Sequence, residues 1–284
     1  MQSQEVSSGL MERLVLLTTA PDLSATEAAE EKSILSYTLP HPTNTNPDSN
    51  RTATTIFISE APLLLGSDGG RTGQRTWPAS LHLASYLTST PEGRATILGK
   101  SVLELGAGAG LLAILCAGPL GAAYVLATDG DVKTATSAIP LNVAINHNLS
   151  RYYGRSSLPV EGRQLGWSAD ADADLATVLP ARGGGVLYDT ILGADLTYDD
   201  DLVEALAGTI AGLVRLCPKA EVLVSAVIRN EDTFDLFLAQ CLEKELSVYD
   251  VDFRCPRLEL QTGLFHALEP EIRIVKIKKE KRVR

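Results

Sequence analysis

Three glycines and one carboxylate stand close together in VLELGAGAG, which covers residues 102–110. Gly106, Gly108 and Gly110 follow one apolar run and precede another, which is typical of a tight strand-to-helix turn that a ligand can approach closely. The spacing GxGxG departs from the GxGxxG of turns that bind a dinucleotide pyrophosphate. Glu104 would repel a pyrophosphate there, whereas it would attract a cationic ammonium group. The stretch therefore predicts a ligand that carries positive charge near this turn.

A second carboxylate follows the next apolar run, YVLAT. This residue, Asp129, lies about 20 residues beyond the glycines, at the position where a carboxylate binds the hydroxyls of a ribose in nucleotide-binding sheets. A cap for the following helix is its alternative role. A cationic head, a ribose and no phosphate site together indicate S-adenosylmethionine rather than NAD. The residues thus favour a methyltransferase over a dehydrogenase.

These side chains need a sheet to hold them, and the apolar runs predict one. Segments with helical periodicity separate the runs, so βαβ crossovers and a mostly parallel, doubly wound α/β sheet are expected. Ligands of such sheets lie beyond the carboxyl ends of the strands. Asp199 or Asp200 is expected to cap one helix, and Asn230 another that runs to about residue 245. The expected strands are 101–105, 124–128, 160–165, 186–194 and 221–228, and the expected helices include 111–117, 132–145 and 202–216.

The first sixty residues differ from the rest of the chain in residue pattern and composition. Helical patterns are expected at residues 4–18 and 25–37, and a loop rich in Pro, Asn, Thr and Ser covers 40–50. The segment TTIFIS predicts a short strand, and WPASLHLASYL predicts a helix that leads into the sheet. We therefore expect a mainly helical N-terminal accessory region at 1–60 and a catalytic domain at 61–284.

Composition excludes several classes of protein. The 284 residues carry a formal net charge of −10, which disfavours direct binding of nucleic acid. Since the chain shows neither an apolar run long enough to span a membrane nor a signal peptide, we expect a cytoplasmic monomer that acts on another protein. The four cysteines lack CxxC spacing and the four histidines lack ligand spacing, so buried thiols, core or surface imidazoles and no metal are expected. The basic end KIKKEKRVR is expected to be a solvated strand end or tail.

Several motifs together resemble one known family. ExGxGxG followed by TDGD is similar to the seven-strand, class I (Rossmann-like) methyltransferases. RTGQRTWPASLHLASYL resembles the helix before the first strand of the family-16 protein methyltransferases, and GADLTY matches their DxxY motif. LGWS resembles their tryptophan-bearing turn, although the acidic residue often found before the tryptophan is missing here. VSAVIRNEDTFDLF resembles the elongation factor 2 lysine methyltransferases, and the whole similarity covers about residues 71–245.

The resemblance implies methyl transfer from S-adenosylmethionine to a lysine of translation elongation factor 2, with S-adenosylhomocysteine as product. The turn glycines and Glu104 would hold the methionine end of the cofactor and Asp129 its ribose. The remaining implied cofactor contacts are Trp77 at the methionine, Trp167 at the adenine, and Ala194 in GADLTY. Asp195 and Tyr198 would shape the methyl-acceptor pocket. Either tryptophan is equally expected as a core aromatic, and Tyr198 as an interface aromatic.

The reaction asks little acid–base chemistry of the protein. The sulfonium already activates the methyl group, so the site must align a neutral lysine amine with it, and no metal is required. Asp195 is expected to orient the incoming amine first and to act as a base only second. Three alternatives stay open. The same fold serves nucleic-acid methyltransferases, which commonly carry [ND]PP[YF] where this chain reads ADLTY, as well as small-molecule methyltransferases and non-catalytic cofactor-binding modules.

Overall fold

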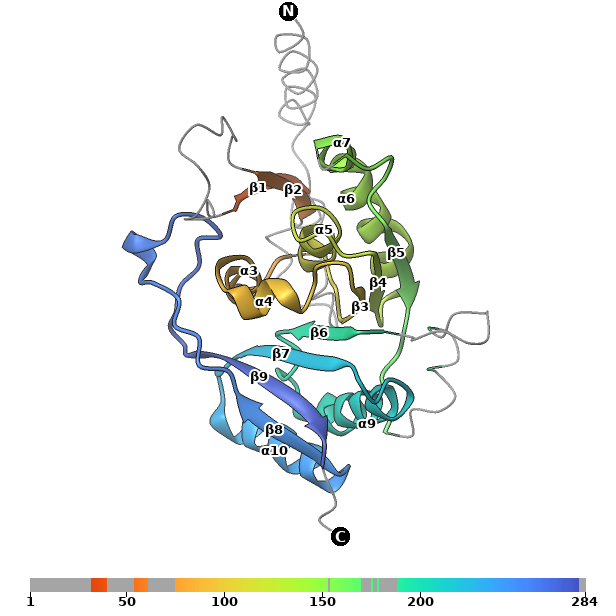
Figure 1. Cartoon of the computed structure of the whole chain (residues 1–284). Coiled ribbons are helices and arrows are strands. Elements are labelled where there is room, and N and C mark those ends of the chain that lie inside the picture. Colours follow the sequence, from red (N-terminus) through yellow and green to blue (C-terminus); the bar gives the residue numbers. More distant parts are fainter. Residues whose placement is uncertain are drawn as a thin grey trace, which may run out of the picture.

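A seven-stranded sheet forms the centre of the molecule in the computed structural model, which describes residues 32–39, 54–60, 75–152, 154–169, 175, 178 and 188–280 (Figure 1). Its strands lie in the order β5-β4-β3-β6-β7-β9-β8. The first five are parallel to one another, while β9 runs antiparallel to both of its neighbours. The strands are β3 (Ser101–Leu105), β4 (Tyr124–Asp129), β5 (Val160–Gln164), β6 (Thr190–Ala194), β7 (Glu221–Val227), β8 (Leu246–Asp250) and β9 (Ile272–Lys279).

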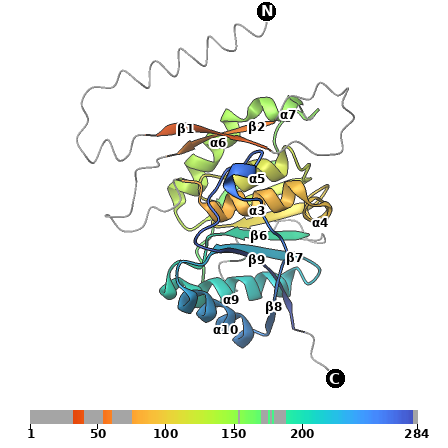
Figure 2. The same cartoon turned by 90° about the vertical axis from the view of Figure 1, so that its left-hand side faces the viewer.

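Helices cover both faces of this sheet, which confirms the predicted doubly wound α/β fold (Figure 2). The helices α3 (Pro78–Ser89), α5 (Leu111–Ala117) and α6 (Ile139–Ile145) pack on one face, and α9 (Asp200–Leu216) and α10 (Glu231–Glu243) on the other. Each face has its own apolar core, because the central strands are buried on both sides. Shorter helical elements are α4 (Pro91–Ala95), η2 (Thr134–Ala138), α7 (His147–Tyr152) and η3 (Leu258–Leu260).

The described part of the N-terminal region is an antiparallel strand pair. It consists of β1 (Ser33–Thr38) and β2 (Thr55–Glu60), and the second confirms the predicted strand. The helix predicted at 25–37 is wrong from Ser33 onward, because SILSYT forms the strand that pairs with β2. Along β2, buried side chains alternate strictly with partly exposed ones. Ile56 and Ile58 are fully buried on the side of the strand that contacts α5 and α6. Sheet pairing here overrides a weak helical pattern.

Asn142 of α6 and Asn146, the residue that follows this helix, fasten β2 to the main body. The Asn142 side chain accepts a hydrogen bond from the backbone of Ser59 at 2.7 Å and donates one to the carbonyl of Ala109 at 2.8 Å. The Asn146 side chain accepts from the backbone of Phe57 at 2.9 Å. Amide side chains thus satisfy the strand's backbone groups where no further strand pairs with it. The hairpin is thereby joined to the helix layer of the catalytic fold.

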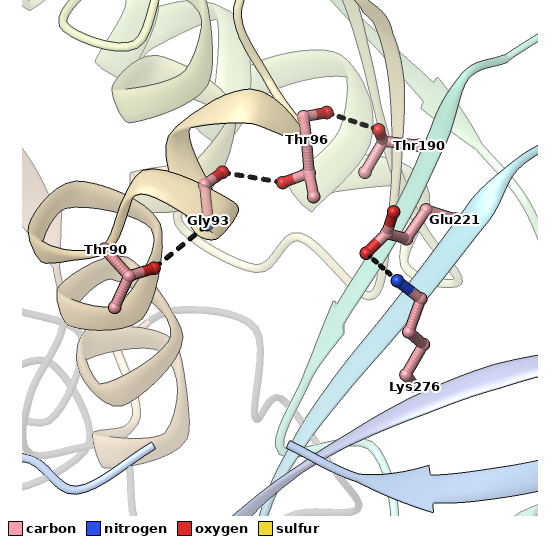
Figure 3. Close-up of polar contacts among 6 residues, drawn as sticks. All are labelled: Thr90, Gly93, Thr96, Thr190, Glu221 and Lys276. Atoms are coloured by element: carbon pink, nitrogen blue, oxygen red, sulfur yellow. Dashed lines mark hydrogen bonds and ion pairs between the residues drawn. The ribbon is translucent and has the colours of Figure 1, made fainter. Parts of the chain in front are cut away.

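Polar contacts connect the helices before the sheet to the start of its central strands (Figure 3). Thr90 caps α4 by accepting a hydrogen bond from the backbone of Gly93 at 2.9 Å. Thr96 donates to the carbonyl of Gly93 and accepts a bond at its own carbonyl from the hydroxyl of Thr190 in β6. On the neighbouring strands Lys276 of β9 forms an ion pair with Glu221 of β7, which holds the antiparallel strand in register.

The predicted elements agree with the structure at most positions. Asp199 caps α9 and Asn230 caps α10, as expected. Of the run predicted as a strand at 186–194, residues 190–194 form β6 and 188–189 precede it, while 186–187 lie outside the described residues. The helix expected at 132–145 is interrupted by the π-helical turn η2. The strand β8 was not predicted. The patterns at 4–18 and 40–50 lie outside the described residues, as do residues 281–284 of the basic end, whose residues 276–279 form the end of β9.

Among the described residues, no helix combines the length and the apolar character that crossing a bilayer requires.

Candidate functional site

A cavity of about 420 Å³ opens at the carboxyl ends of the parallel strands, within the size range of small-ligand and cofactor sites. Eight of the nine predicted site residues line it, and Glu104 does not. The lining residues that the sequence predicted are Trp77, Gly106, Gly108, Asp129, Trp167, Ala194, Asp195 and Tyr198. The cavity therefore lies where a doubly wound sheet binds its ligands.

The glycine turn after β3 is held in a conformation that favours residues without a Cβ. Gly106, Gly108 and Gly110 have φ of 58°, 53° and 84°, in the left-handed region. The backbone of Ala107 donates to the carbonyl of Thr128 at 2.8 Å, which anchors the turn to the neighbouring strand β4. A Cβ on Gly106 would come within 2.6 Å of Leu196. The turn is thus rigid, and its packing needs glycine.

Asp129 ends β4 and supports the same turn. One carboxylate oxygen, Oδ2, accepts a hydrogen bond from the backbone of Gly108 at 3.0 Å, and the other accepts from the backbone of Asp131 at 3.0 Å. Burial raises the pKa of this carboxyl group, while these two backbone bonds lower it. Because each oxygen has a further lone pair and the residue lines the cavity, the carboxylate can still accept bonds from ligand hydroxyls.

Glu104 lies behind the glycine turn rather than on the cavity wall. Only 3% of its surface is exposed, and its Oε2 atom is buried without a hydrogen-bond partner. Burial raises the pKa of Glu104 to about 8, with a smaller contribution from the charge of Asp129 and an opposing one from the backbone of Ala113. This oxygen of Glu104 therefore has neither a cation nor a hydrogen-bond donor beside it to stabilise a negative charge.

Trp167 follows β5 and lines the cavity. The turn that carries this tryptophan packs closely against helix α9. The backbone of Ser168 donates to the hydroxyl of Thr209 at 3.1 Å. A Cβ on Gly208 would lie 2.6 Å from the carbonyl oxygen of Ala169, so this glycine is needed for the close contact. The Trp167 ring also lies 3.4 Å from where a Cβ of Gly106 would be. The aromatic ring therefore packs beside the glycine turn.

Asp195 ends β6 in a left-handed conformation with φ of 58°, which is uncommon for a residue other than glycine. Arg229, after β7, forms two hydrogen bonds with its carboxylate, at 2.9 and 2.7 Å. The same guanidinium lies 5.2 Å from the ring centroid of Trp77, which precedes α3. Two strand ends and one helix start therefore meet in a charged and aromatic group at one side of the cavity.

Tyr198 lies at the cavity rim, directly before the cap of α9, and 46% of the residue's surface is exposed. Sequence reasoning assigned roles to Asp195 and Tyr198 but missed Arg229 as the partner of Asp195. The sequence does contain a signal for Arg229, because this cationic residue directly follows the next predicted strand after the DxxY motif. Apolar and helix-capping residues of the cavity were also missed, because they carry no chemical signature: Leu165, Leu196, Leu202, Asp131 and Thr134.

The features of this cavity fit S-adenosylmethionine. Glu104 lies behind the turn with one oxygen unpartnered, and an ammonium group that reached it past the glycines would stabilise its charged form. Asp129 offers acceptors to a ribose, and Trp167 offers an aromatic face to a base. Dinucleotide turns place a pyrophosphate at the start of the following helix. A buried acid behind this turn opposes a pyrophosphate there.

Comparison with known proteins extends this result. Residues 61–243 match the family described as lysine methyltransferase. The protein-lysine N-methyltransferase EFM3 of Chaetomium thermophilum is 32% identical over 98% of this chain and 77% of its own length. The EFM3 of Saccharomyces cerevisiae is 31% identical over 66% of this chain, which spans about half of that relative (53%). The protein N-lysine methyltransferase METTL21A of Danio rerio is 33% identical over 64% of this chain and 72% of its own length.

The family match, the parallel sheet and the cavity agree with one another. The matched residues include every strand from β3 to β7 and all nine predicted site residues. The chain therefore belongs to the lysine methyltransferase family, and it is a protein-lysine N-methyltransferase that uses S-adenosylmethionine.

Proposed function

We propose that this methyltransferase modifies a lysine of translation elongation factor 2. The observation that carries the proposal is the stretch VSAVIRNEDTFDLF, which resembles the elongation factor 2 branch of the family and forms the end of β7, Arg229 and the start of α10. The 32% identity with the protein-lysine N-methyltransferase EFM3 across 98% of the chain supports a protein lysine as the methyl acceptor.

In the proposed cofactor site, each strand end has a separate task. Glu104 orders the ammonium end, the turn of Gly106 and Gly108 borders the methionine chain, and Asp129 binds the ribose. Trp167 packs against the adenine, while Trp77 and Ala194 close the methionine side. When bound, S-adenosylmethionine supplies an activated methyl group. The protein's residues fix its direction by holding both ends of the cofactor.

The proposed acceptor site lies beside Asp195, Arg229 and Tyr198. The paired Asp195 is held rigidly by two bonds from Arg229, and its remaining lone pairs accept a hydrogen bond from the lysine amine. The guanidinium also disfavours a second positive charge nearby, so the lysine is driven toward its neutral, nucleophilic form. Because Arg229 shares the carboxylate, Asp195 positions the amine, and the amine proton leaves toward solvent at the open rim beside Tyr198.

Purified elongation factor 2 from cells that lack this methyltransferase, together with the whole extract, tests the proposal. With methyl-labelled S-adenosylmethionine, the expected result is label on a lysine of that single protein. Label only on RNA or on small metabolites would contradict a protein substrate, and label on a different protein would contradict the choice of substrate. Cofactor binding without any labelled product would identify a non-catalytic module.

Substitution at the acceptor site separates its role from cofactor binding. Asp195→Asn removes the charge that orients the amine, so transfer is expected to fall by about 100-fold or more. Affinity for S-adenosylhomocysteine should change by less than about threefold, since Asp195 is proposed not to hold the cofactor. Asp200→Asn, on the exposed first turn of α9, is the matched control and should keep full activity. Equal losses of transfer and affinity in Asp195→Asn would move this residue into the cofactor site.

A further inference from the structure

Two histidines and one cysteine converge outside the methyl-transfer cavity. His82 lies on α3, while Cys255 and His266 lie on the segment 251–271 that connects β8 to β9. One ligand atom from each of the three lies within 4.8 Å of the others. The connecting segment crosses beside α3 in both views of the molecule (Figures 1 and 2). His82 thus joins two residues that lie 173 and 184 positions later in the sequence in one group of metal-ligating side chains.

The hydrogen bonds define the protonation of the two imidazoles. Nδ1 of His266 lies 2.7 Å from the carbonyl oxygen of Leu264, which can only accept, so this nitrogen carries the proton. Nε2 of His266 is then a lone-pair donor, and it lies 3.1 Å from Nδ1 of His82. A histidine whose other nitrogen donates to a backbone carbonyl is the common arrangement of metal ligands, because that bond fixes the ring's orientation.

The surroundings of the two rings leave one ring nitrogen without a partner. His82 and His266 are both buried, and their rings meet edge-on with centroids 5.3 Å apart. Nε2 of His82 is buried without any hydrogen-bond partner. A pair of histidines that served only to fill the core would not need an orphaned nitrogen or a thiol beside it.

We propose that His82, His266 and Cys255 bind one Zn²⁺ ion that fastens the segment 251–271 to helix α3. Two imidazoles and one thiolate are a ligand set that zinc accepts in tetrahedral sites, with a water molecule in the fourth position. His82 binds through Nδ1 and His266 through Nε2, so the proton that lies between these two nitrogens in the metal-free pair moves to Nε2 of His82. The Cys255 thiol releases its proton to solvent as the sulfur–metal bond forms. The ion takes no part in methyl transfer. Its role is to hold together two segments that are distant in sequence.

Packing around the three ligands supports a site that is prepared in advance. The ring of Phe253 lies edge-on to His82, with centroids 5.2 Å apart, and also edge-on to Tyr86, at 5.4 Å. The side chain of Gln261 accepts a hydrogen bond from the backbone of His266 at 2.9 Å and donates one to its carbonyl at 3.0 Å. These contacts hold the segment so that little rearrangement is needed when a metal binds.

Metal uptake by the unmodified protein tests the proposal directly. Protein treated with a chelator and then given Zn²⁺ should bind one equivalent in competition with a chromogenic chelator. Its melting temperature should rise with Zn²⁺ concentration, because the ion binds the folded state alone. Co²⁺ in place of Zn²⁺ should produce the ultraviolet charge-transfer absorption of a metal–thiolate bond. Absence of stoichiometric uptake, or of the thiolate band, would overturn the proposal.

Substitutions assign the uptake to these residues. Cys255→Ser and His266→Gln should each weaken Zn²⁺ binding more than about 100-fold, since even the partners of metal ligands cost about 10- to 100-fold when removed. The matched controls are Cys217→Ala, whose thiol lies in the other core, and His147→Gln, whose side chain is exposed. Both controls should bind Zn²⁺ like the unmodified protein. Unchanged uptake in Cys255→Ser would also overturn the proposal, and the readings on unmodified protein hold even if a variant fails to fold.

Discussion

Glu104→Gln separates the electrostatic role of the buried acid from its packing. In the folded protein burial raises the pKa of Glu104 to about 8 from an ordinary value of 4.5. A raised acid pKa means that the folded state holds a proton that the unfolded state has lost. Stability is therefore greatest below pH 4.5 for this group, declines as the pH rises toward 8, and then levels off. Glutamine, which has no charge to lose, removes this dependence.

The expected magnitude follows from the same shift. At pH 7 the unfolded carboxyl is ionised and the folded one is mostly protonated. Because pH 7 lies roughly 2.5 units above the ordinary pKa, keeping the folded carboxyl protonated costs about 3 kcal/mol of folding free energy. Relative to the unmodified protein, the free energy of unfolding of Glu104→Gln should thus rise by about 3 kcal/mol between pH 4.5 and pH 7. This corresponds to a relative gain of about 6–12 °C in melting temperature. The glutamine's own polar cost is constant across pH, so the slope is the quantity to compare.

Ligand binding supplies the second half of the test. If the ammonium end of S-adenosylhomocysteine pairs with Glu104, binding must ionise the acid, so close to one proton should be released at pH 7. Calorimetry in two buffers with different ionisation enthalpies measures that proton, and Glu104→Gln should release none. At pH 8 the variant should also bind about 10- to 100-fold more weakly. Parallel stability curves for the two proteins, together with no difference in proton release, would refute the role assigned to Glu104.

Two further substitutions test the cavity walls. Asp129→Asn can still accept the hydrogen bond from Gly108 but offers the ribose a weaker acceptor, so calorimetric affinity for S-adenosylhomocysteine should fall by about 10- to 100-fold; unchanged affinity would leave Asp129 with a purely structural role. Gly208→Ala should displace the turn that carries Trp167 and cost about 1–3 kcal/mol of stability by thermal melting, because its Cβ would meet backbone oxygen at 2.6 Å. Gly166→Ala is the matched control, since nothing lies within 4 Å of its added Cβ, and equal effects of the two substitutions would contradict this account.

Strong local patterns allowed much of this fold to be predicted. Apolar runs at 101–105 and 221–228 and the caps Asp199 and Asn230 act over a few residues, so their signals are present in the sequence itself. The strand β1 could not be predicted in this way, because its structure comes from pairing with β2, which follows later in the sequence. Tertiary pairing decided that segment, not its own periodicity.

The same distinction between local sequence signals and tertiary contacts applies to the candidate site. The glycine turn, Asp129 and the DxxY residues sit at fixed offsets from strands, so their convergence follows from a parallel sheet. The bond between Arg229 and Asp195 and the group around His82 depend on distances between elements, which spacing alone does not contain. Glu104 illustrates an intermediate case. Its place two residues before the glycine turn is read from the sequence, but its full burial behind the turn and its missing partner became visible only in three dimensions.

The placement of β9 affects how this protein can be synthesised. The strand β9 follows β8 along the chain, yet it lies between β7 and β8 in the sheet. On the ribosome, β8 therefore has no sheet neighbour until translation has passed Lys279. Until that moment the outer edge of β7 exposes unpaired backbone groups to other nascent chains. Assembly of the sheet is thus delayed to a late step of synthesis, and a stalled ribosome would release a form with an open, adhesive edge.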